Sequence, residues 1–238
     1  MFKYKELDKI MLNTEKAFTL AEVLITLGII GVVAALTIPS LIGNYKKVQT
    51  VTQLKKIYSG LQQSVQLSQV TYGDINTWDW NLGLEEFFKT YLSSNLKVIK
   101  YCGTSDLSCW NDEGINSLSG GKYEDSPLKS NWAKLILSDG TFIAMQKQGN
   151  HVHINIDLNG KKRPNTAGKD IFDLTLTADK LVDSYHNISK PGLYFYGSGL
   201  TKDELKTKQF GCANNQVGLM CGALIILDGW QISSDYPW

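Results

Sequence analysis

Oxygen-bearing side chains recur at short spacing in the stretch from Asp157 to Phe172. Asp157 and Asn159 stand two residues apart, Gly160 follows them, and a second carboxylate comes at Asp170. A hard cation such as calcium binds several oxygens of this kind, including backbone carbonyls, and glycine permits the sharp bend that such a loop needs. The pattern therefore predicts a calcium site made by Asp157, Asn159 and Asp170. The alternative is a turn in which the first two side chains bond their own backbone and Asp170 caps the next segment of the chain.

The cysteines offer a second kind of chemistry, because they could form disulfides or hold zinc. There are four of them, Cys102, Cys109, Cys212 and Cys221. More than one pairing is open. We expect the local pairs, Cys102 with Cys109 and Cys212 with Cys221, since each closes a short loop. Zinc is the less favoured use, because neither spacing is the tight C-x-x-C of zinc ribbons.

Two histidines, His151 and His153, share one face of an expected strand. They could bind a metal, but we favour the interpretation that they lie on an exposed strand face. No Ser-His-Asp order, phosphate loop or pair of buried carboxylates emerges elsewhere, so we do not expect an enzyme. The formal net charge of +1 argues against a dedicated nucleic-acid binder.

One carboxylate, Glu22, stands at the start of an apolar run that extends from Val23 to Ile42. The run has the length of a bilayer-spanning helix, about 20 mostly apolar residues. Placing an acid inside hydrocarbon costs roughly 2.5–3.5 kcal/mol on insertion scales, so Glu22 requires a partner or a function. A newly formed amine would be such a partner.

The segment Lys16-Ala17-Phe18-Thr19-Leu20-Ala21-Glu22 resembles the N-terminal signature of type IV prepilins and of the pseudopilins of type II secretion. That signature is a small residue, Phe, Thr, Leu, any residue and Glu, followed by an apolar helix. The resemblance implies that a prepilin peptidase cuts between Ala17 and Phe18 and methylates the new amino group of Phe18. Ala17 stands where the family usually has glycine. Gly31 and Pro39 match a helix-loosening glycine and a proline found at these spacings in many members.

Two other interpretations of the N-terminal region compete with this one. An ordinary secretory signal would have a basic start and a small-residue cleavage site after the apolar segment, for which Val33-Ala34-Ala35 could serve. An uncleaved membrane anchor would need no cleavage site. Neither explains why Phe18 and Glu22 occur together.

The resemblance divides the chain into a leader peptide, residues 1–17, and a long helix with a transmembrane half, 18–42, and an amphipathic half, 43–70. A globular domain, 71–238, comes after the helix. The resemblance also implies a single-pass protein of the bacterial inner membrane, with a cytoplasmic N-terminus and a periplasmic domain. Disulfides persist in that compartment.

The pattern downstream of the helix favours strands. Residues 132–137 and 141–145 flank an Asp-Gly turn and predict a hairpin, and residues 151–157 alternate as a third strand. Further strands are expected at 192–196 and 223–227. A short helix is expected at 84–92 and a loop-rich segment at 93–130. The fold class is therefore α+β and type IV pilin-like, with a long N-terminal helix packed on an antiparallel sheet.

The function implied by the resemblance is that of a structural subunit in a type II secretion or type IV pilus-like filament. Its partners would be the prepilin peptidase, identical or related subunits, an inner-membrane assembly platform and the membrane itself. Glu22, Gly31 and Pro39 would act in assembly. The loop of Asp157 and Asp170 is also similar to one in pseudopilin-like proteins, whose major members carry a structural calcium. The alternative is a minor pilin acting as an adhesin or DNA-uptake tip through the 93–130 loops.

Overall fold

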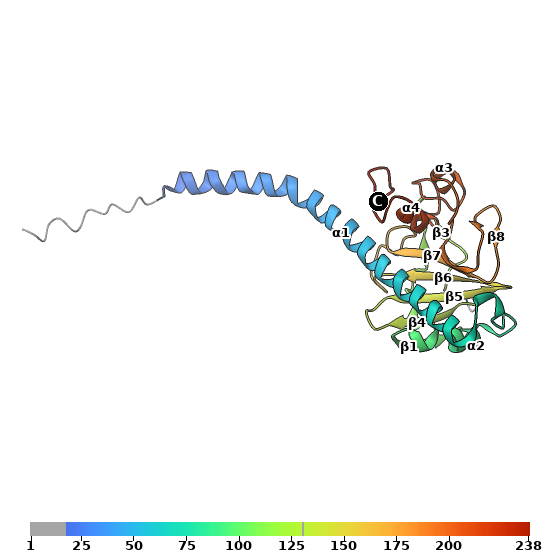
Figure 1. Ribbon diagram of the computed structural model, residues 1–238. Coiled ribbons are helices and arrows are strands. Elements are labelled where there is room, and N and C mark those ends of the chain that lie inside the picture. The colour runs from blue at the N-terminus through green and yellow to red at the C-terminus, as the bar shows by residue number, and fades with distance from the viewer. Residues whose placement is uncertain (1–17, 130) are drawn as a thin grey trace, which may run out of the picture. The chain divides into compact units, whose positions relative to one another are not determined.

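The structure is a computed structural model that describes residues 18–129 and 131–238 (Figure 1). The chain forms two compact units, one ending at Lys46 and one comprising Lys47–Trp238. Helix α1, Leu20–Tyr72, contributes residues to both units. Its observed bounds differ by only two or three residues from the expected helix over 18–69, as is usual for helix ends.

The part of α1 in the first unit is helical without interruption, including at Pro39. The missing N–H of Pro39 predicts a kink or a local melt of the helix, and of these two the melt is not observed. The helix is long and apolar enough to cross a membrane, and its most apolar window buries none of its residues against the protein. An apolar surface of this extent requires a non-aqueous environment or a partner. This segment is therefore the expected membrane anchor.

The second unit is built on one antiparallel sheet of six strands in the order β1-β4-β5-β6-β7-β10. This layout confirms the α+β class with a long N-terminal helix and an antiparallel sheet. The strands are β1 (Val98–Gly103), β4 (Ala133–Leu137), β5 (Phe142–Gln148), β6 (His151–Asp157), β7 (Ile171–Thr177) and β10 (Gly192–Phe195).

Strands β1 and β7 were not expected from the sequence. Strand β1 lies in the segment interpreted as loop, and its register with β4 shifts twice, between Val98 and Lys100 and between Tyr101 and Gly103. Such irregularity erases the simple alternation that marks a strand. Strand β7 is buried on both faces, so its polar residues do not mark a solvent-exposed face and the alternation that identifies a half-exposed strand is missing.

Shorter elements connect the strands and cover the sheet. They are η1 (Ile75–Thr77), α2 (Leu84–Tyr91), η2 (Ser93–Asn95), η3 (Leu107–Cys109), β2 (Ile115–Asn116), β3 (Lys122–Tyr123), β8 (Leu181–Val182), β9 (Asn187–Ile188), α3 (Lys202–Thr207) and α4 (Cys221–Leu227).

The expected strand at 223–227 is wrong, because this segment belongs to helix α4. A short apolar run has no periodicity that separates strand from buried helix. At the start of this helix, Gly222 lies so close to the ring of Phe195 that an added Cβ would clash with it.

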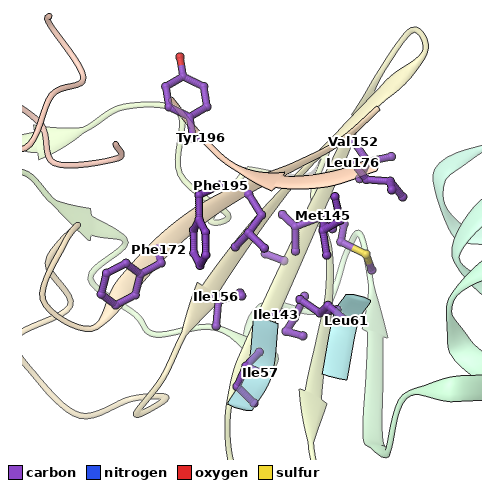
Figure 2. Close-up of a cluster of buried hydrophobic side chains, with 14 of the residues drawn as sticks. Ile57, Leu61, Ile143, Met145, Val152, Ile156, Phe172, Leu176, Phe195 and Tyr196 are labelled. Atoms are coloured by element: carbon purple, nitrogen blue, oxygen red, sulfur yellow. The ribbon is translucent and has the colours of Figure 1, made fainter. Parts of the chain in front are cut away.

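One face of the sheet packs against the part of α1 that belongs to the second unit. Leu54, Ile57, Leu61 and Val65 form a buried stripe on the helix at steps of three and four. Figure 2 shows Ile57 and Leu61 beside Ile143 and Ile156 of the sheet.

Hydrogen bonds hold α1 against the ends of the strands. The Gln53 side chain donates to the Leu158 carbonyl at 2.5 Å, and the Gln62 side chain donates to the Leu193 carbonyl at 2.7 Å. These bonds give hydrogen-bond donors to two carbonyl groups that lie beside the helix.

The opposite face of the sheet is polar and yet largely covered. Asn155, Asp157, Asp173 and Thr175 are all buried there. The expectation that His153 lies on an exposed strand face is therefore wrong, because loops cover this side and leave its side chain 17% exposed. Burial lowers the pKa of His153 to about 4, so the ring is neutral at pH 7.

The structure contains the two local disulfides, Cys102–Cys109 and Cys212–Cys221. The first joins β1 to η3. The second joins the loop after α3 to the first residue of α4, and its Cys221 packs against Gly168, whose φ is +79°. An added Cβ at Gly168 would clash with Cys221, so the disulfide can pack here only because this position is glycine.

Replacing Cys212 and Cys221 together by serine is expected to lower the free energy of unfolding by roughly 2–3 kcal/mol, the value for a loop of this length. The Cys102→Ser/Cys109→Ser variant is the matched control, since its sequence separation is 7 rather than 9. Urea unfolding of the full chain in detergent micelles measures both. If the Cys212→Ser/Cys221→Ser variant loses more unfolding free energy than the control variant, the difference is due to the packing of Cys221 against Gly168. A loss below about 0.5 kcal/mol in the Cys212→Ser/Cys221→Ser variant would contradict the prediction.

Candidate functional site

The start of helix α1 carries the residues that could direct assembly. The Glu22 carboxylate accepts hydrogen bonds from the backbone N–H of Thr19 at 2.8 Å and from its hydroxyl at 2.7 Å. The Thr19 hydroxyl in turn accepts the N–H of Glu22 at 3.2 Å. This reciprocal arrangement is a capping box, and it satisfies amide groups that the first helical turn leaves free.

Both contacts to Glu22 use the Oε2 atom, so the carboxylate has capacity for a further donor. Thr19 was not singled out as a partner of Glu22 from the sequence. The signal was present, because a Thr followed three residues later by Glu is the pattern of a capping box.

The other residues expected to act in assembly lie along the same helix. Apart from the neighbouring backbone of the helix itself, no atom of residues 18–129 or 131–238 lies within 4 Å of a Cβ added at Gly28 or Gly31. Small residues of this kind allow another helix to approach closely in lipid. Phe18 is 84% exposed, and Ala17, the residue before the expected cut, falls outside the described residues.

The loop from Asp157 to Asp170 lies in the second unit, where it connects β6 to β7. The structure brings all three expected ligands together: Asn159 contacts both carboxylates, through its side-chain nitrogen to Asp170 Oδ2 at 3.0 Å and through its backbone N–H to Asp157 Oδ1 at 3.2 Å. Burial raises the pKa of the Asp157 carboxyl to about 7, although a hydrogen bond from Asn111 opposes the shift. Burial also raises the pKa of Asp170.

Backbone donors hold Asp170 in place. The N–H groups of Asn165 and Thr166 donate to its carboxylate at 2.9 Å and 2.7 Å. These donors precede Asp170, whereas the alternative interpretation has Asp170 cap the segment that follows it. Only the bond from the Asn159 N–H to Asp157 is one that the turn interpretation predicts. Asn111 and Asn165 were not expected in this loop's network. Asn111 comes from a segment 46 residues earlier in the chain, so no local pattern could reveal its role.

The same loop contains oxygens without a hydrogen-bond partner. The Asn159 and Asn165 side-chain oxygens are both buried, and neither has a hydrogen-bond partner in the part of the chain that the structure describes. A buried amide oxygen without a donor is costly, and a cation would satisfy it. Two carboxylates and two amide oxygens are chemically suited to calcium, which takes its remaining ligands from carbonyls and water. The residues therefore fit the group that the sequence pattern predicts.

Comparison with known families locates two matches. Residues 12–38 match the prokaryotic N-terminal methylation motif, which confirms the prepilin-type signature around Phe18 and Glu22. Residues 40–238 match a family described as a family of unknown function, DUF6613. No curated protein and no solved structure matches the chain.

Proposed function

Because the chain belongs to the DUF6613 family and carries a prepilin-type methylation motif, we propose that it is a structural subunit of an extracytoplasmic filament of the type II secretion or type IV pilus class. The motif makes it a pilin- or pseudopilin-like precursor. The observation that carries the proposal is the pairing of this motif with an apolar helix that the protein itself leaves uncovered. In a filament, the same helices of neighbouring subunits would cover one another.

The proposed mechanism starts with removal of residues 1–17 by the prepilin peptidase on the cytoplasmic side. Cleavage gives Phe18 a new amino group, which is methylated and keeps its positive charge. This amine pairs with Glu22 of an adjacent subunit inside the apolar bundle. An unpaired acid is expensive there, so the pair both stabilises the contact and selects one register between subunits.

The assembly platform of the inner membrane would draw subunits from the membrane into the filament. The domain formed by residues 71–238 would then face the periplasm. Both disulfides lie in this domain, and they favour an oxidising compartment on that side.

The N-terminus of the native protein tests the proposal directly. Mass spectrometry of the protein purified from membranes is expected to find an N-terminal peptide that begins at N-methylated Phe18. An N-terminus at Met1 would indicate an uncleaved anchor, and one at Leu36 would indicate an ordinary secretory signal. Either result would contradict the proposal.

A structural calcium in the Asp157–Asp170 loop forms a second part of the proposal. Its support is the pair of unsatisfied amide oxygens beside two buried carboxylates. When bound, calcium would supply positive charge to these oxygens and hold the β6–β7 connection closed. Asp157, Asn159 and Asp170 would be ligands, and Asn165 would add its side-chain oxygen.

The pH dependence of stability provides a test. Without calcium, the folded-state pKa of Asp157, about 7, lies above its ordinary value of 3.8, so this carboxyl stabilises the fold when protonated. Its contribution is complete below about pH 4 and is lost as the pH rises through 7, by a few kcal/mol at most. The Asp157→Asn variant should lack this slope.

Calcium should restore the folding stability that the wild-type protein loses at pH 8, because the ion binds the ionised form of Asp157. Thermal unfolding at pH 8 with calcium or with a chelator is the measurement. A rise in Tm with calcium that is absent in Asp157→Asn supports the site. Equal Tm values with calcium and with chelator in the wild type would contradict the calcium site and support the interpretation of the loop as a hydrogen-bonded turn.

A further inference from the structure

A small polar cavity lies on the sheet face opposite α1. Its volume is about 100 Å³. Three central strands supply Gln146, His153 and Asp173, which alternate along the strands with core residues that face the helix. We call this cavity the outer-face pocket.

Aromatic side chains complete the wall of the outer-face pocket. Trp132 precedes β4, Tyr123 belongs to β3, and Tyr196 comes directly after β10. Figure 2 shows Tyr196 pointing away from the hydrophobic cluster that its neighbour Phe195 enters. The Tyr196 ring is held by His186, with ring centroids 4.6 Å apart.

The floor of the outer-face pocket is an acid with one unpaired oxygen among the described residues. Asp173 is only 5% exposed, and its Oδ1 atom makes no hydrogen bond within the described residues. The Nδ1 atom of His153 lies 4.0 Å from Asp173 Oδ1, which is too far for it to donate a hydrogen bond. Burial, and next the charge of Asp125, raise the pKa of the Asp173 carboxyl well above its usual value. A cationic donor in the pocket would pair with the free Oδ1 atom and oppose that shift.

A second carboxylate stands at the pocket. The Asp125 side chain is 40% exposed and is paired with Lys129 at 3.6 Å, while Asp173 lies deeper. His153 is neutral at pH 7, since its pKa is held near 4. The outer-face pocket therefore combines acidic oxygens with aromatic walls, and such a combination attracts cations, because the faces of aromatic rings carry partial negative charge.

Three of the seven residues that line the pocket are aromatic, which suits an organic cation better than a metal ion, because a metal ion requires several oxygen, nitrogen or sulfur ligands. The cavity volume accommodates several waters or a small head group. An ammonium group suits these conditions, because it donates to a carboxylate and lies against aromatic rings.

We propose that the outer-face pocket binds a small organic ammonium group, with Asp173 accepting its N–H donors and the rings of Tyr123, Trp132 and Tyr196 enclosing it. The pocket is a ligand site on the globular domain. This proposal does not depend on filament assembly, so its test can fail while the proposed function holds, and the reverse is also true. The ammonium could belong to a free amine or to a lysine side chain of another protein.

Titration of the purified full chain in detergent micelles tests the proposal. Propylammonium chloride is the probe for a free amine, and Nα-acetyl-lysine methylamide is the probe for a lysine side chain. The neutral 1-propanol has a similar shape without the charge. Isothermal titration calorimetry at constant ionic strength is expected to detect saturable binding of at least one ammonium probe and none of 1-propanol. The tighter of the two ammonium probes identifies the source.

The Asp173→Asn variant keeps the shape of the side chain but removes its charge, and it is expected to weaken ammonium binding about tenfold or more. Asp179→Asn is the matched control, because Asp179 is exposed just beyond the same strand and does not line the pocket. It should bind like the wild type. Unchanged affinity in Asp173→Asn, or equal binding of 1-propanol, would overturn the proposal.

A second measurement needs no change at Asp173. The Trp132 indole N–H is buried in the pocket wall without a hydrogen-bond partner, so its NMR signal reports occupancy. The signal, assigned with a Trp132→Phe variant, is expected to shift with the ammonium probe along the same saturation curve as the calorimetry. An indole signal that stays in place while the probe binds would locate the binding elsewhere and overturn the proposal.

Discussion

Replacing Glu22 by glutamine is expected to prevent filament assembly while leaving cleavage between Ala17 and Phe18 largely intact. The substitution removes the charge that would neutralise the Phe18 amine of a neighbouring subunit. Breaking such a pair in an apolar setting costs roughly 3–5 kcal/mol, which corresponds to a hundredfold or greater loss in association between subunits. The measurement is the share of the protein that sediments as sheared filaments from cells that carry the assembly machinery.

Glutamine is more informative here than alanine. The Glu22 side chain also closes the capping box with Thr19, and glutamine can make the same hydrogen bonds without the charge. Glu22→Ala removes both the cap and the charge. If Glu22→Gln assembles normally while Glu22→Ala does not, the carboxylate serves the cap alone, and the proposed pairing with Phe18 is refuted.

Thr19→Val provides the complementary control. It removes the hydroxyl that Glu22 contacts but leaves the charge, so it should weaken the first helical turn by about 1 kcal/mol and assemble nearly as well as the wild type. Processing of all three variants can be followed by the mass of the N-terminal peptide. A variant that is not cleaved reports on the peptidase rather than on assembly.

Phe195→Ala is expected to lower the free energy of unfolding by about 3–5 kcal/mol, the range for large core aromatics. Phe195 is fully buried and stacks on Tyr58 of α1 with ring centroids 4.8 Å apart. It also meets Trp230 near the C-terminus and Gly222 of α4. One ring therefore joins the helix, the edge of the sheet and the C-terminal region, and its loss leaves a cavity among them.

Urea unfolding of the full chain in detergent micelles, followed by tryptophan fluorescence, measures this loss. Ile99→Ala is the control, because Ile99 is 66% exposed on β1 and should change stability by no more than about 0.5 kcal/mol. A loss below about 1.5 kcal/mol for Phe195→Ala would mean that the surrounding rings collapse into the space, and the assigned role in joining the three elements would be wrong.

The features that the sequence predicted correctly depend on patterns among residues that are close together in the chain. A lone acid before a long apolar run, and the residues around Phe18, sufficed for the prepilin-type signature. The Asp-Gly turn between 137 and 141 and the alternation over 151–157 located three central strands, because turn chemistry and side-chain alternation act between near neighbours.

The features that were missed depend on contacts between distant parts of the chain. The 223–227 segment is helical, and Gly222 before it packs so closely on Phe195 that an added Cβ would clash, a contact that no property of an isolated apolar run reveals. The burial of His153 depends on loops that cover the outer face of the sheet, although alternation alone suggested an exposed position.

By itself, the sequence determined the anchor, the cleavage signature, the α+β class and the composition of the Asp157–Asp170 loop. Tertiary structure alone decided that Asn111 donates to Asp157 of this loop, and that Asp173 lies in an aromatic pocket with one oxygen unpaired among the described residues. The physical reason is range: periodicity and turn preferences act over a few residues, whereas burial and the pairing of polar groups are settled by segments that meet only after the chain has folded.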